Sequence, residues 1–311
     1  MDALLFLQAR YKIVQICNCI YRNKWGDLCH LWEQLDLELE KIIPSSNKIY
    51  DVLVECRNCR ASGNFMHFHD LLFYKIDFFL AQELCSRTLE ERKLLSEKAF
   101  VENKQAIENH HKDVSNLLYA NNEFSRIECS YVGTENVSIS IKEGDRVFRL
   151  FSSINPWLEC SSILNAREMD KGCPDEVYVL GFGGGHAVEE LERRYPKAQI
   201  KVYLPNKDIF QVVMYNLPRK NILINQRLEL IYDPMAIGFL EVLEKNLCKN
   251  TFYIDRQELR TCFRSAVEAE SVIIKYKNKL RANNAQDYIY ESKTLMTGNV
   301  GKSIHKHINK F

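Results

Sequence analysis

The sequence predicts the α/β fold class: a parallel-sheet domain preceded by a β-hairpin and a helical N-terminal domain. Three observations lead to this prediction. Apolar residues recur at helical spacing up to about residue 120, strict alternation begins at Phe124, and a strand, a glycine-rich turn and a helix follow one another from Val177. The expected segments are a helical domain at 1–120, a hairpin or meander at 121–151, the α/β domain at 152–256, and C-terminal helices or a linker at 257–311.

Length and composition limit the classes of protein to consider. With 311 residues the chain can form one large or two ordinary domains. The formal charge is +1, from 42 basic and 41 acidic residues, so no overall field favours nucleic acid or an anionic membrane. No apolar run approaches the roughly 20 residues of a membrane span, and the start lacks a basic leader, so we expect a cytoplasmic protein without a membrane span.

The N-terminal part predicts helices with one apolar face each. These helices run from Leu4 to Ile20, from Leu28 to Ile42, from Ile49 to Arg60 and from Phe65 to about Ser86, and a more polar helix or pair of helices covers Leu89–Tyr119. The chain has eleven cysteines, an odd number scattered through apolar segments, which is typical of buried thiols in a reducing compartment.

One cysteine pair in this part has a spacing found in metal sites. Cys56 and Cys59, with His67 and His69 downstream, can be drawn as a zinc site. Without a second CxxC pair, buried thiols on one helix are the favoured interpretation, and we expect no metal site. We expect no redox role either, because no thioredoxin-like strand precedes the pair.

The glycine-rich turn is the strongest functional signal in the chain. Val177–Leu180 is a run of β-formers, and Ile200–Leu204 is a second one after the helix. The glycines between them are Gly181, Gly183, Gly184 and Gly185. Glycines allow positive φ and let a ligand approach the backbone at the start of a helix, so the unit predicts a Rossmann-like domain with a right-handed parallel crossover.

Several residues near this turn are candidate ligand contacts. A phosphate or a sugar carboxylate fits the N–H groups of Gly184, Gly185 and His186, and Asn206 offers a neutral donor and acceptor after the second strand. Asp233 follows the predicted strand Leu228–Tyr232, at the edge where open α/β sheets bind ligands. The alternatives are that the glycines serve only close packing, that His186 lines a surface rather than acting as a base, and that Asp233 caps a helix.

A second motif precedes the turn. The alternating runs Phe124–Cys129, Val137–Ile141 and Val147–Phe151 predict the hairpin, and a helix begins at Pro156 with Asn155 as its cap. Together with the turn, this segment resembles the N-terminal region of the motility accessory factor family, bacterial proteins associated with flagellin glycosylation. The matching residues are Leu150, Ser152, Asn155, Pro156, Glu159, Cys160, Gly181, Phe182, Gly183, Gly185, Pro205 and Asn206.

The resemblance covers about residues 120 to 300 and implies a role without a catalytic centre of its own. The sialyltransferase-like domain credited with sugar transfer would begin after the closing helices, so the chain is expected to be a fragment or a free-standing relative. Its implied ligands are a nucleotide or nucleotide sugar, and its implied partners are flagellin or another acceptor protein and a sugar-transfer domain. The chain departs from the family at Leu204, where the family has an acidic residue, and at Phe151, where it often has histidine.

Two other functions remain open. A methyltransferase that uses S-adenosylmethionine has a similar glycine turn, but it usually has carboxylates at the positions of Val179 and Leu204. A Rossmann-like scaffold without a small ligand is the third hypothesis. The basic stretch Lys302–Lys310 is interpreted as a solvated helix end rather than a nucleic-acid site, because aromatic residues are absent there except Phe311.

Overall fold

The computed structural model describes residues 3–44, 47–119, 127–131, 136–143, 145–165, 174–246, 251–259, 262, 271, 274 and 289–291. The chain divides into two compact units, one formed by Met1–Leu95 with Val132–Asn136 and the other by Ser96–Tyr131 with Val137–Phe311. The limit lies within helix α6 (Leu89–His110), whereas the sequence places it near residue 120. Most of the C-terminal segment 257–311, for which the sequence predicts helices or a linker, lies outside the described residues.

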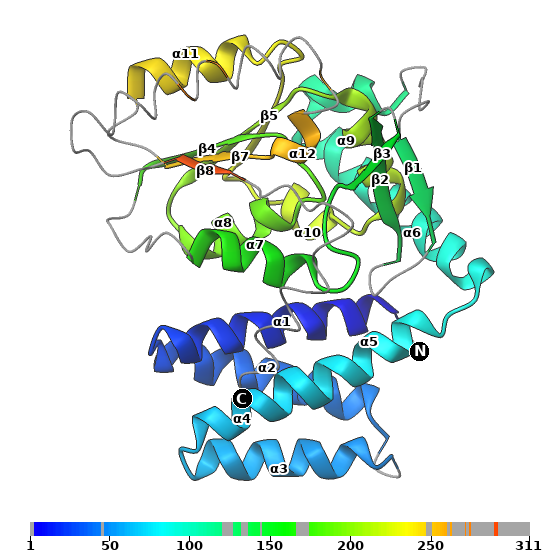
Figure 1. The fold of residues 1–311 in the computed structure, drawn as a ribbon, viewed down its shortest axis with the longest axis vertical. Coiled ribbons are helices and arrows are strands. Elements are labelled where there is room, and N and C mark those ends of the chain that lie inside the picture. Colours follow the sequence, from blue (N-terminus) through cyan, green and yellow to red (C-terminus); the bar gives the residue numbers. More distant parts are fainter. Residues whose placement is uncertain are drawn as a thin grey trace. The chain divides into compact units, whose positions relative to one another are not determined.

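The first unit is helical, as its apolar periodicity predicts. It contains α1 (Ala3–Tyr21), α2 (Trp25–Ile42), α3 (Ile49–Ala61), α4 (Phe65–Leu71), one π-helical turn (Leu72–Ile76), α5 (Asp77–Cys85) and the start of α6 (Figure 1). The buried side chains of α2 recur every three or four residues, which places one face of the helix in the core. A buried ion pair joins Arg10 to Asp77, with Nε and Oδ1 2.8 Å apart. Among the described helices, none combines the length and the apolar character that crossing a bilayer requires.

The second unit contains a three-stranded antiparallel sheet. Its strands are β1 (Ile127–Ser130), β2 (Ser138–Glu143) and β3 (Arg146–Arg149), in the order β1-β2-β3. Alternate residues of β2, Ile139 and Ile141, are buried together with residues of α6 and of the 3₁₀ helix η2 (Lys112–Tyr119). The end of α6 and η2 therefore share their hydrophobic core with the strands that follow them.

A five-stranded sheet forms the centre of the second unit, and every strand pair in it is parallel. The strand order is β6-β5-β4-β7-β8, and the strands are β4 (Glu176–Leu180), β5 (Gln199–Leu204), β6 (Leu228–Tyr232), β7 (Thr251–Ile254) and β8 (Ile289–Glu291). The helices of this part are α7 (Pro156–Asn165), α8 (His186–Arg194), α9 (Lys207–Asn216), α10 (Lys220–Leu223), α11 (Ile237–Asn246) and α12 (Arg256–Leu259). Strands and helices alternate from β4 to α12, which makes this an α/β fold.

Both faces of the parallel sheet are buried, which explains why its strands are continuous apolar runs. Val177 and Val179 of β4 pack into the core cluster that contains residues of α8 and α9. Tyr178 and Leu180 point to the opposite face and pack with residues of α11. Figure 1 shows α11 on one side of the sheet and α7, α8 and α10 on the other.

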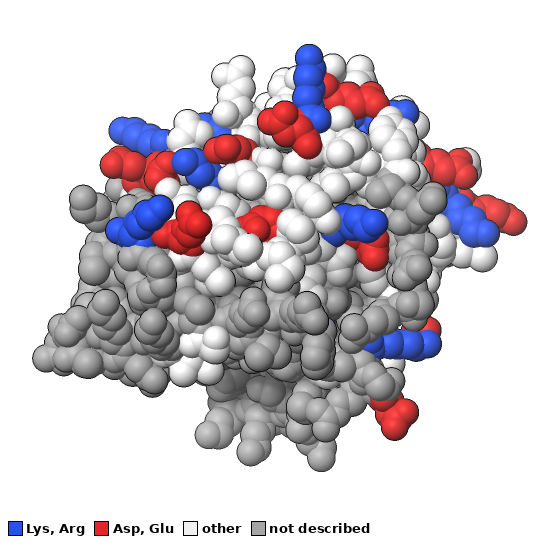
Figure 2. Space-filling model, turned by 90° about the horizontal axis from the view of Figure 1, so that it is seen from above, with Lys and Arg blue, Asp and Glu red and all other residues white. Residues whose placement is uncertain are grey.

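Charged side chains of both signs are interspersed on the described part of the face shown in Figure 2. On that part of the face, charges of the two signs alternate rather than forming separate blocks. This arrangement gives no large field of one sign on that part of the face.

Candidate ligand site at the glycine turn

Three loops leave the parallel sheet at the same edge, because the carboxyl ends of parallel strands lie together. Gly181 follows β4, and its N–H donates to Tyr203 O at 2.8 Å. Asp255 follows β7, and its N–H donates to Leu180 O at 2.8 Å. The glycine turn and Asp255 therefore follow two neighbouring strands, β4 and β7, and lie next to each other at this edge. Asp233 follows β6, the strand at the edge of the sheet. Strands β5 and β4 lie between β6 and β7.

The glycine turn has the backbone conformation that its sequence predicts. Gly181, Gly183 and Gly185 have φ angles of +91°, +54° and +84°. A left-handed conformation favours glycine because a Cβ atom is strained there. The N–H of Gly185 donates to Phe182 O at 2.9 Å and closes the turn. One of the three N–H groups that the sequence analysis assigns to an anion, at Gly184, Gly185 and His186, is therefore already hydrogen-bonded within the chain.

Two acidic residues from the end of β7 pack directly onto the glycines. A Cβ atom added to Gly183 would lie 2.2 Å from Asp255 Oδ2, and one added to Gly181 would lie 2.8 Å from Asp255 Cβ. Asp255 also caps α12, because its Oδ1 accepts hydrogen bonds from the N–H groups of Gln257 and Glu258, both at 3.0 Å. Close packing against a carboxylate is thus a second reason for glycine at these positions.

Glu258 is fully buried and contacts the turn itself. The N–H of Gly183 donates to Glu258 Oε2 at 2.7 Å, and backbone groups of Phe182 and Asn206 also hydrogen-bond to its carboxyl group. Burial raises the pKa of Glu258 well above its ordinary value, the negative charge of Asp255 raises it further, and the backbone hydrogen bonds oppose both effects. A carboxyl group of the chain therefore occupies the glycine turn.

Glu159 brings a third carboxyl group to the same place from α7. Its Oε2 accepts a hydrogen bond from the N–H of Ser152 at 2.7 Å. Burial raises the pKa of Glu159 to about 7; the Ser152 N–H opposes this shift, and the charge of Asp255 adds to it. Glu159 and Glu258 thus both have raised pKa values, and Asp255 contributes to both shifts. Such a cluster of perturbed carboxyl groups marks a candidate functional site.

The other motif residues before α7 position Glu159. Asn155 caps the helix, since its Oδ1 accepts from the N–H of Leu158 at 2.9 Å, and Pro156 is the first helical residue. Ser152 Oγ accepts from the N–H groups of Ile154 and Asn155, at 3.2 and 3.3 Å. The Ser-x-x-Asn-Pro-x-x-Glu pattern is therefore a helix start that directs one carboxylate toward the glycine turn.

His186, the first residue of α8, is buried against aromatic rings. Its ring centroid lies 4.9 Å from that of Phe151 and 5.2 Å from that of Trp157, both in edge-to-face geometry. Arg219 Nη2 lies 2.7 Å from His186 Nε2, and Arg219 Nε donates to Gly184 O. Because a guanidinium group only donates, His186 Nε2 must accept, which assigns the neutral ring with its proton on Nδ1.

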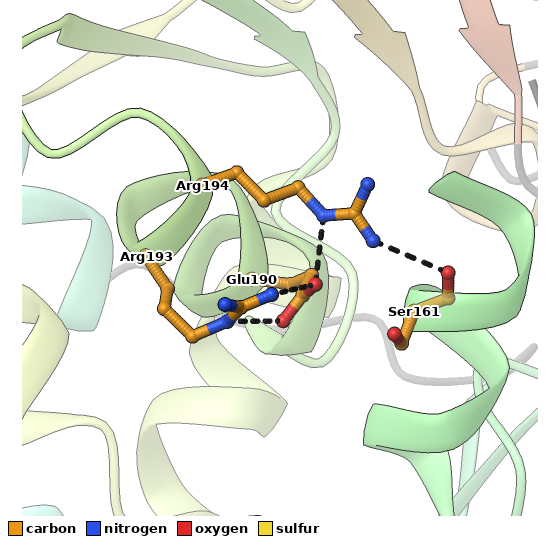
Figure 3. A network of polar contacts seen from close by, with 4 residues as sticks. All are labelled: Ser161, Glu190, Arg193 and Arg194. Carbon is orange, nitrogen blue, oxygen red and sulfur yellow. Dashed lines mark hydrogen bonds and ion pairs between the residues drawn. The ribbon is translucent and has the colours of Figure 1, made fainter. Parts of the chain in front are cut away.

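A buried ionic network connects α7 to α8 and so holds Glu159 near His186. Both Arg193 and Arg194 donate to the Glu190 carboxylate, at 2.6 and 2.7 Å, and Arg194 Nη2 reaches Ser161 O at 3.3 Å (Figure 3). Burial alone would raise the pKa of Glu190, but the hydrogen bonds and charges of the two arginines outweigh it and lower the pKa. Trp157 Nε1 adds a bond to Glu189 at 2.7 Å.

These groups surround a small hollow. Its lining includes residues from α7 and the segment before it, from the glycine turn and the start of α8, and from the end of β7 onward, among them Phe151, Glu159, Cys160, Gly184, His186, Asp255 and Gln257. The hollow has a volume of about 20 Å³, enough for about one water molecule. A larger ligand must therefore displace lining side chains or bind at the mouth of the hollow.

The structure brings some of the predicted site residues together and gives others local roles. Gly181, Gly183, Gly184, His186 and Glu159 surround the hollow or the turn beside it. Asn206 Oδ1 caps α9 through the N–H groups of Asp208 and Ile209. Asp233 caps α11, accepting from Ile237 and Phe239, so the capping alternative describes its contacts. The sequence analysis did not single out Asp255, Glu258 or Arg219, which lie far along the chain from the glycines.

The cysteine pair of the first unit has ordinary protein contacts. Cys56 and Cys59 are buried on α3, and His67 is exposed with Nε2 2.9 Å from Glu55 Oε1. Across the described residues of the chain, no group of three or more His, Cys, Asp or Glu side chains is arranged to hold a metal ion.

The fold and the hollow define an α/β protein with a carboxyl-rich candidate ligand site at the carboxyl edge of a parallel sheet. No protein-family model matches the chain, and no curated protein matches it significantly.

Proposed function

We propose that the second unit is a Rossmann-like ligand-binding domain of a protein glycosylation system of the motility-accessory-factor type. In this proposal the domain binds a sugar or nucleoside-containing ligand in the cytoplasm and does not itself transfer the sugar. Its partners would be an acceptor protein such as flagellin and a sugar-transfer domain. The family assignment rests on the sequence resemblance alone.

One observation carries the ligand-binding part of the proposal: the two motif segments come together in space. Glu159 and Cys160 belong to the first segment and Gly184 to the second, and all three line one hollow. More than twenty residues, including strand β4, separate the two segments in the chain, so local folding alone does not explain their meeting.

The topology supports the same position for a ligand. The strand order β6-β5-β4-β7-β8 becomes 3-2-1-4-5 when the strands are numbered from β4, the order used by dinucleotide-binding folds. In such sheets the order reverses beside the first strand, and ligands bind in the crevice outside the strand ends at that point. Here that point lies between β4 and β7, where the glycine turn meets Asp255.

Calorimetric titration of the full chain tests ligand binding. We expect micromolar binding of at least one ligand from a panel of CMP, UDP and their sugar conjugates. At pH 8, above the Glu159 pKa of about 7, Glu159→Gln should weaken that binding roughly tenfold, because it removes a charged acceptor from the hollow. Glu241→Gln, a change at an exposed residue of α11, is the matched control and should bind like the wild type. Absence of binding by the whole panel would favour a scaffold without a small ligand.

S-adenosylmethionine is the second candidate ligand because of the carboxyl groups at the turn. The sequence lacks acidic residues at Val179 and Leu204, but the structure supplies Asp255 and Glu258 from another part of the chain. Carboxylates complement the positive sulfonium and ammonium groups of this ligand. Micromolar binding of S-adenosylmethionine, with none of the sugar nucleotides, would favour methyl transfer over the glycosylation role.

A further inference from the structure

Glu258 lies where a glycine turn offers its N–H groups to an anion. Its carboxyl group receives the N–H of Gly183 at 2.7 Å and backbone hydrogen bonds of Phe182 and Asn206. Phe182 and Gly183 belong to the turn after β4, and Asn206 follows β5. Converging N–H groups from a turn are the means by which such folds hold a phosphate or carboxylate of a ligand. A carboxyl group of the chain itself therefore fills the position that such an anion would take.

We propose that Glu258 determines the specificity of this site by filling its anion position, so that phosphate is excluded and a ligand is held through its hydroxyl or amine groups. The inference rests on the proposed function, because it concerns the same ligand site. In this arrangement the Glu258 carboxyl group takes the place that the sequence analysis assigns to a phosphate on the N–H groups of the glycine turn.

The surroundings of Glu258 support exclusion of phosphate. Asp255 lies against Gly183, so that a Cβ atom there would be 2.2 Å from its Oδ2. Glu159 and Asp255 line the hollow beside the turn. A phosphate would have to displace Glu258 and enter next to these two acids, where like charges repel. Ionised carboxylates are acceptors only, so they suit the O–H groups of a sugar or ribose and the N–H groups of an amine.

Arg219 places a guanidinium group against the turn, where it contacts the turn's carbonyl side. Among the described contacts of Arg219, Nε donates to Gly184 O and Nη2 donates to His186 Nε2. In these contacts, the N–H groups of Arg219 donate to a carbonyl oxygen of the turn and to the histidine ring. The carboxyl group of Glu258 instead accepts from an N–H group of the turn, that of Gly183. The positive charge stabilises the turn without making it a phosphate site.

Titration with inorganic pyrophosphate tests the proposal on the full chain. The wild type should show no measurable binding. Glu258→Ala vacates the N–H groups, and it should bind pyrophosphate at least roughly tenfold more tightly than the wild type. Glu258→Gln keeps an oxygen on the N–H group of Gly183 and leaves the position filled, so it should not bind pyrophosphate. Glu241→Ala, which removes an exposed charge from the same unit, should behave like the wild type.

Two results would overturn the proposal: pyrophosphate binding by the wild type as tight as by Glu258→Ala, or a folded Glu258→Ala protein that does not bind it. Circular dichroism establishes folding. If Glu258→Ala does not fold, Glu258→Ser, which also shortens the side chain but keeps a polar group, decides alone, since a gain supports the proposal and no gain contradicts it. Failure of the proposed function is a separate outcome, because it is read from wild-type binding of nucleotides, their sugar conjugates and S-adenosylmethionine.

Discussion

At the scale of single residues, Glu159 accepts a backbone hydrogen bond near the start of its helix, in a buried position that disfavours a charged carboxylate. Its Oε2 accepts the N–H of Ser152, yet burial raises its pKa from 4.5 to about 7. A folded-state pKa above the unfolded value means that the folded protein binds a proton more tightly. The stabilising effect of that proton is fully present below about pH 4.5 and is lost as the pH rises to about 7.

Glu159→Gln should therefore stabilise the protein at pH 8. The shift corresponds to about 3 kcal/mol, and because solvent partly reaches the group we expect a gain on the order of 2 kcal/mol, or several degrees in melting temperature. The gain should shrink to roughly 0.4 kcal/mol near pH 4.5, where the glutamate is protonated in the folded protein and about half protonated in the unfolded chain. Thermal melts of both proteins between pH 4.5 and 8 measure this difference. A constant difference across that range would contradict the assigned pKa.

Gly183 provides the second prediction at this scale. Its φ of +54° is left-handed, and a Cβ atom would lie 2.2 Å from Asp255 Oδ2. Gly183→Ala should lower the free energy of unfolding by roughly 2–4 kcal/mol, from backbone strain and displacement of the carboxylate. Urea unfolding measures the change.

Gly238 is the matched glycine for this comparison. It lies in α11, where a Cβ atom would meet its nearest neighbours at 3.4 Å, an ordinary contact distance. Gly238→Ala should leave stability unchanged or raise it by about 0.5–1 kcal/mol, because alanine favours the helix. Equal losses at both positions would mean that the contact with Asp255 does not decide the requirement for glycine at 183.

The residues of the candidate site differ in how far the sequence predicts them. Gly181, Gly183 and Gly185 are predictable because positive φ in a tight turn selects glycine locally. Glu159 is predicted as part of a motif, but its position beside the turn depends on how α7 packs on α8. Asp255 and Glu258 look like an ordinary helix cap and a helical glutamate in the sequence. Only the adjacency of β4 and β7 places them against the glycines.

At the scale of elements, strand and helix periodicity predicts most of the described second unit. β6 occupies the predicted residues Leu228–Tyr232, and α7 begins at the predicted Pro156, since burial on both sides and a proline start leave clear local patterns. The pairing order of the strands has no local signature and comes from the packing of helices on both faces. The same applies to the contact of α7 with α8.

Arg194 tests how strongly that helix contact depends on its ionic network. The Arg194 side chain is 3% exposed, and its guanidinium group connects Glu190 to the carbonyl of Ser161. Arg194→Ala should cost roughly 2–4 kcal/mol, because it removes a buried partner of Glu190 and one link between α7 and α8. Lys245→Ala is the control, since Lys245 pairs with Glu241 at 3.7 Å at the surface and its loss should change stability by less than about 0.5 kcal/mol. Chemical unfolding of both variants measures the comparison, and a loss below 1 kcal/mol for Arg194→Ala would show that apolar packing alone holds the helices.

At the scale of the whole molecule, the second unit includes residues that the sequence assigns to the helical domain. Ile107 of α6 and Leu117 and Leu118 of η2 are buried in the core cluster that contains β4 and β5. Asn103 Nδ2 donates to Met214 O and Leu217 O, at 2.8 and 2.7 Å. The apolar spacing of these residues predicts a helix but does not reveal which core the helix belongs to. The sequence pattern alone therefore places the boundary between the two domains near residue 120, where the helical spacing ends.

The difference between the two limits is testable with two fragments of the chain. Residues 96–311 contain all of this core and should unfold cooperatively, whereas residues 121–311 lack the buried face of α6 and η2 and leave apolar surface of the second unit uncovered. We expect the shorter fragment to aggregate or to lose its cooperative thermal transition. Melting curves followed by circular dichroism, with amide dispersion in proton–nitrogen NMR spectra, distinguish the two. If the shorter fragment unfolds as cooperatively as the longer one, the helices before residue 120 are dispensable for the core that holds the glycine turn.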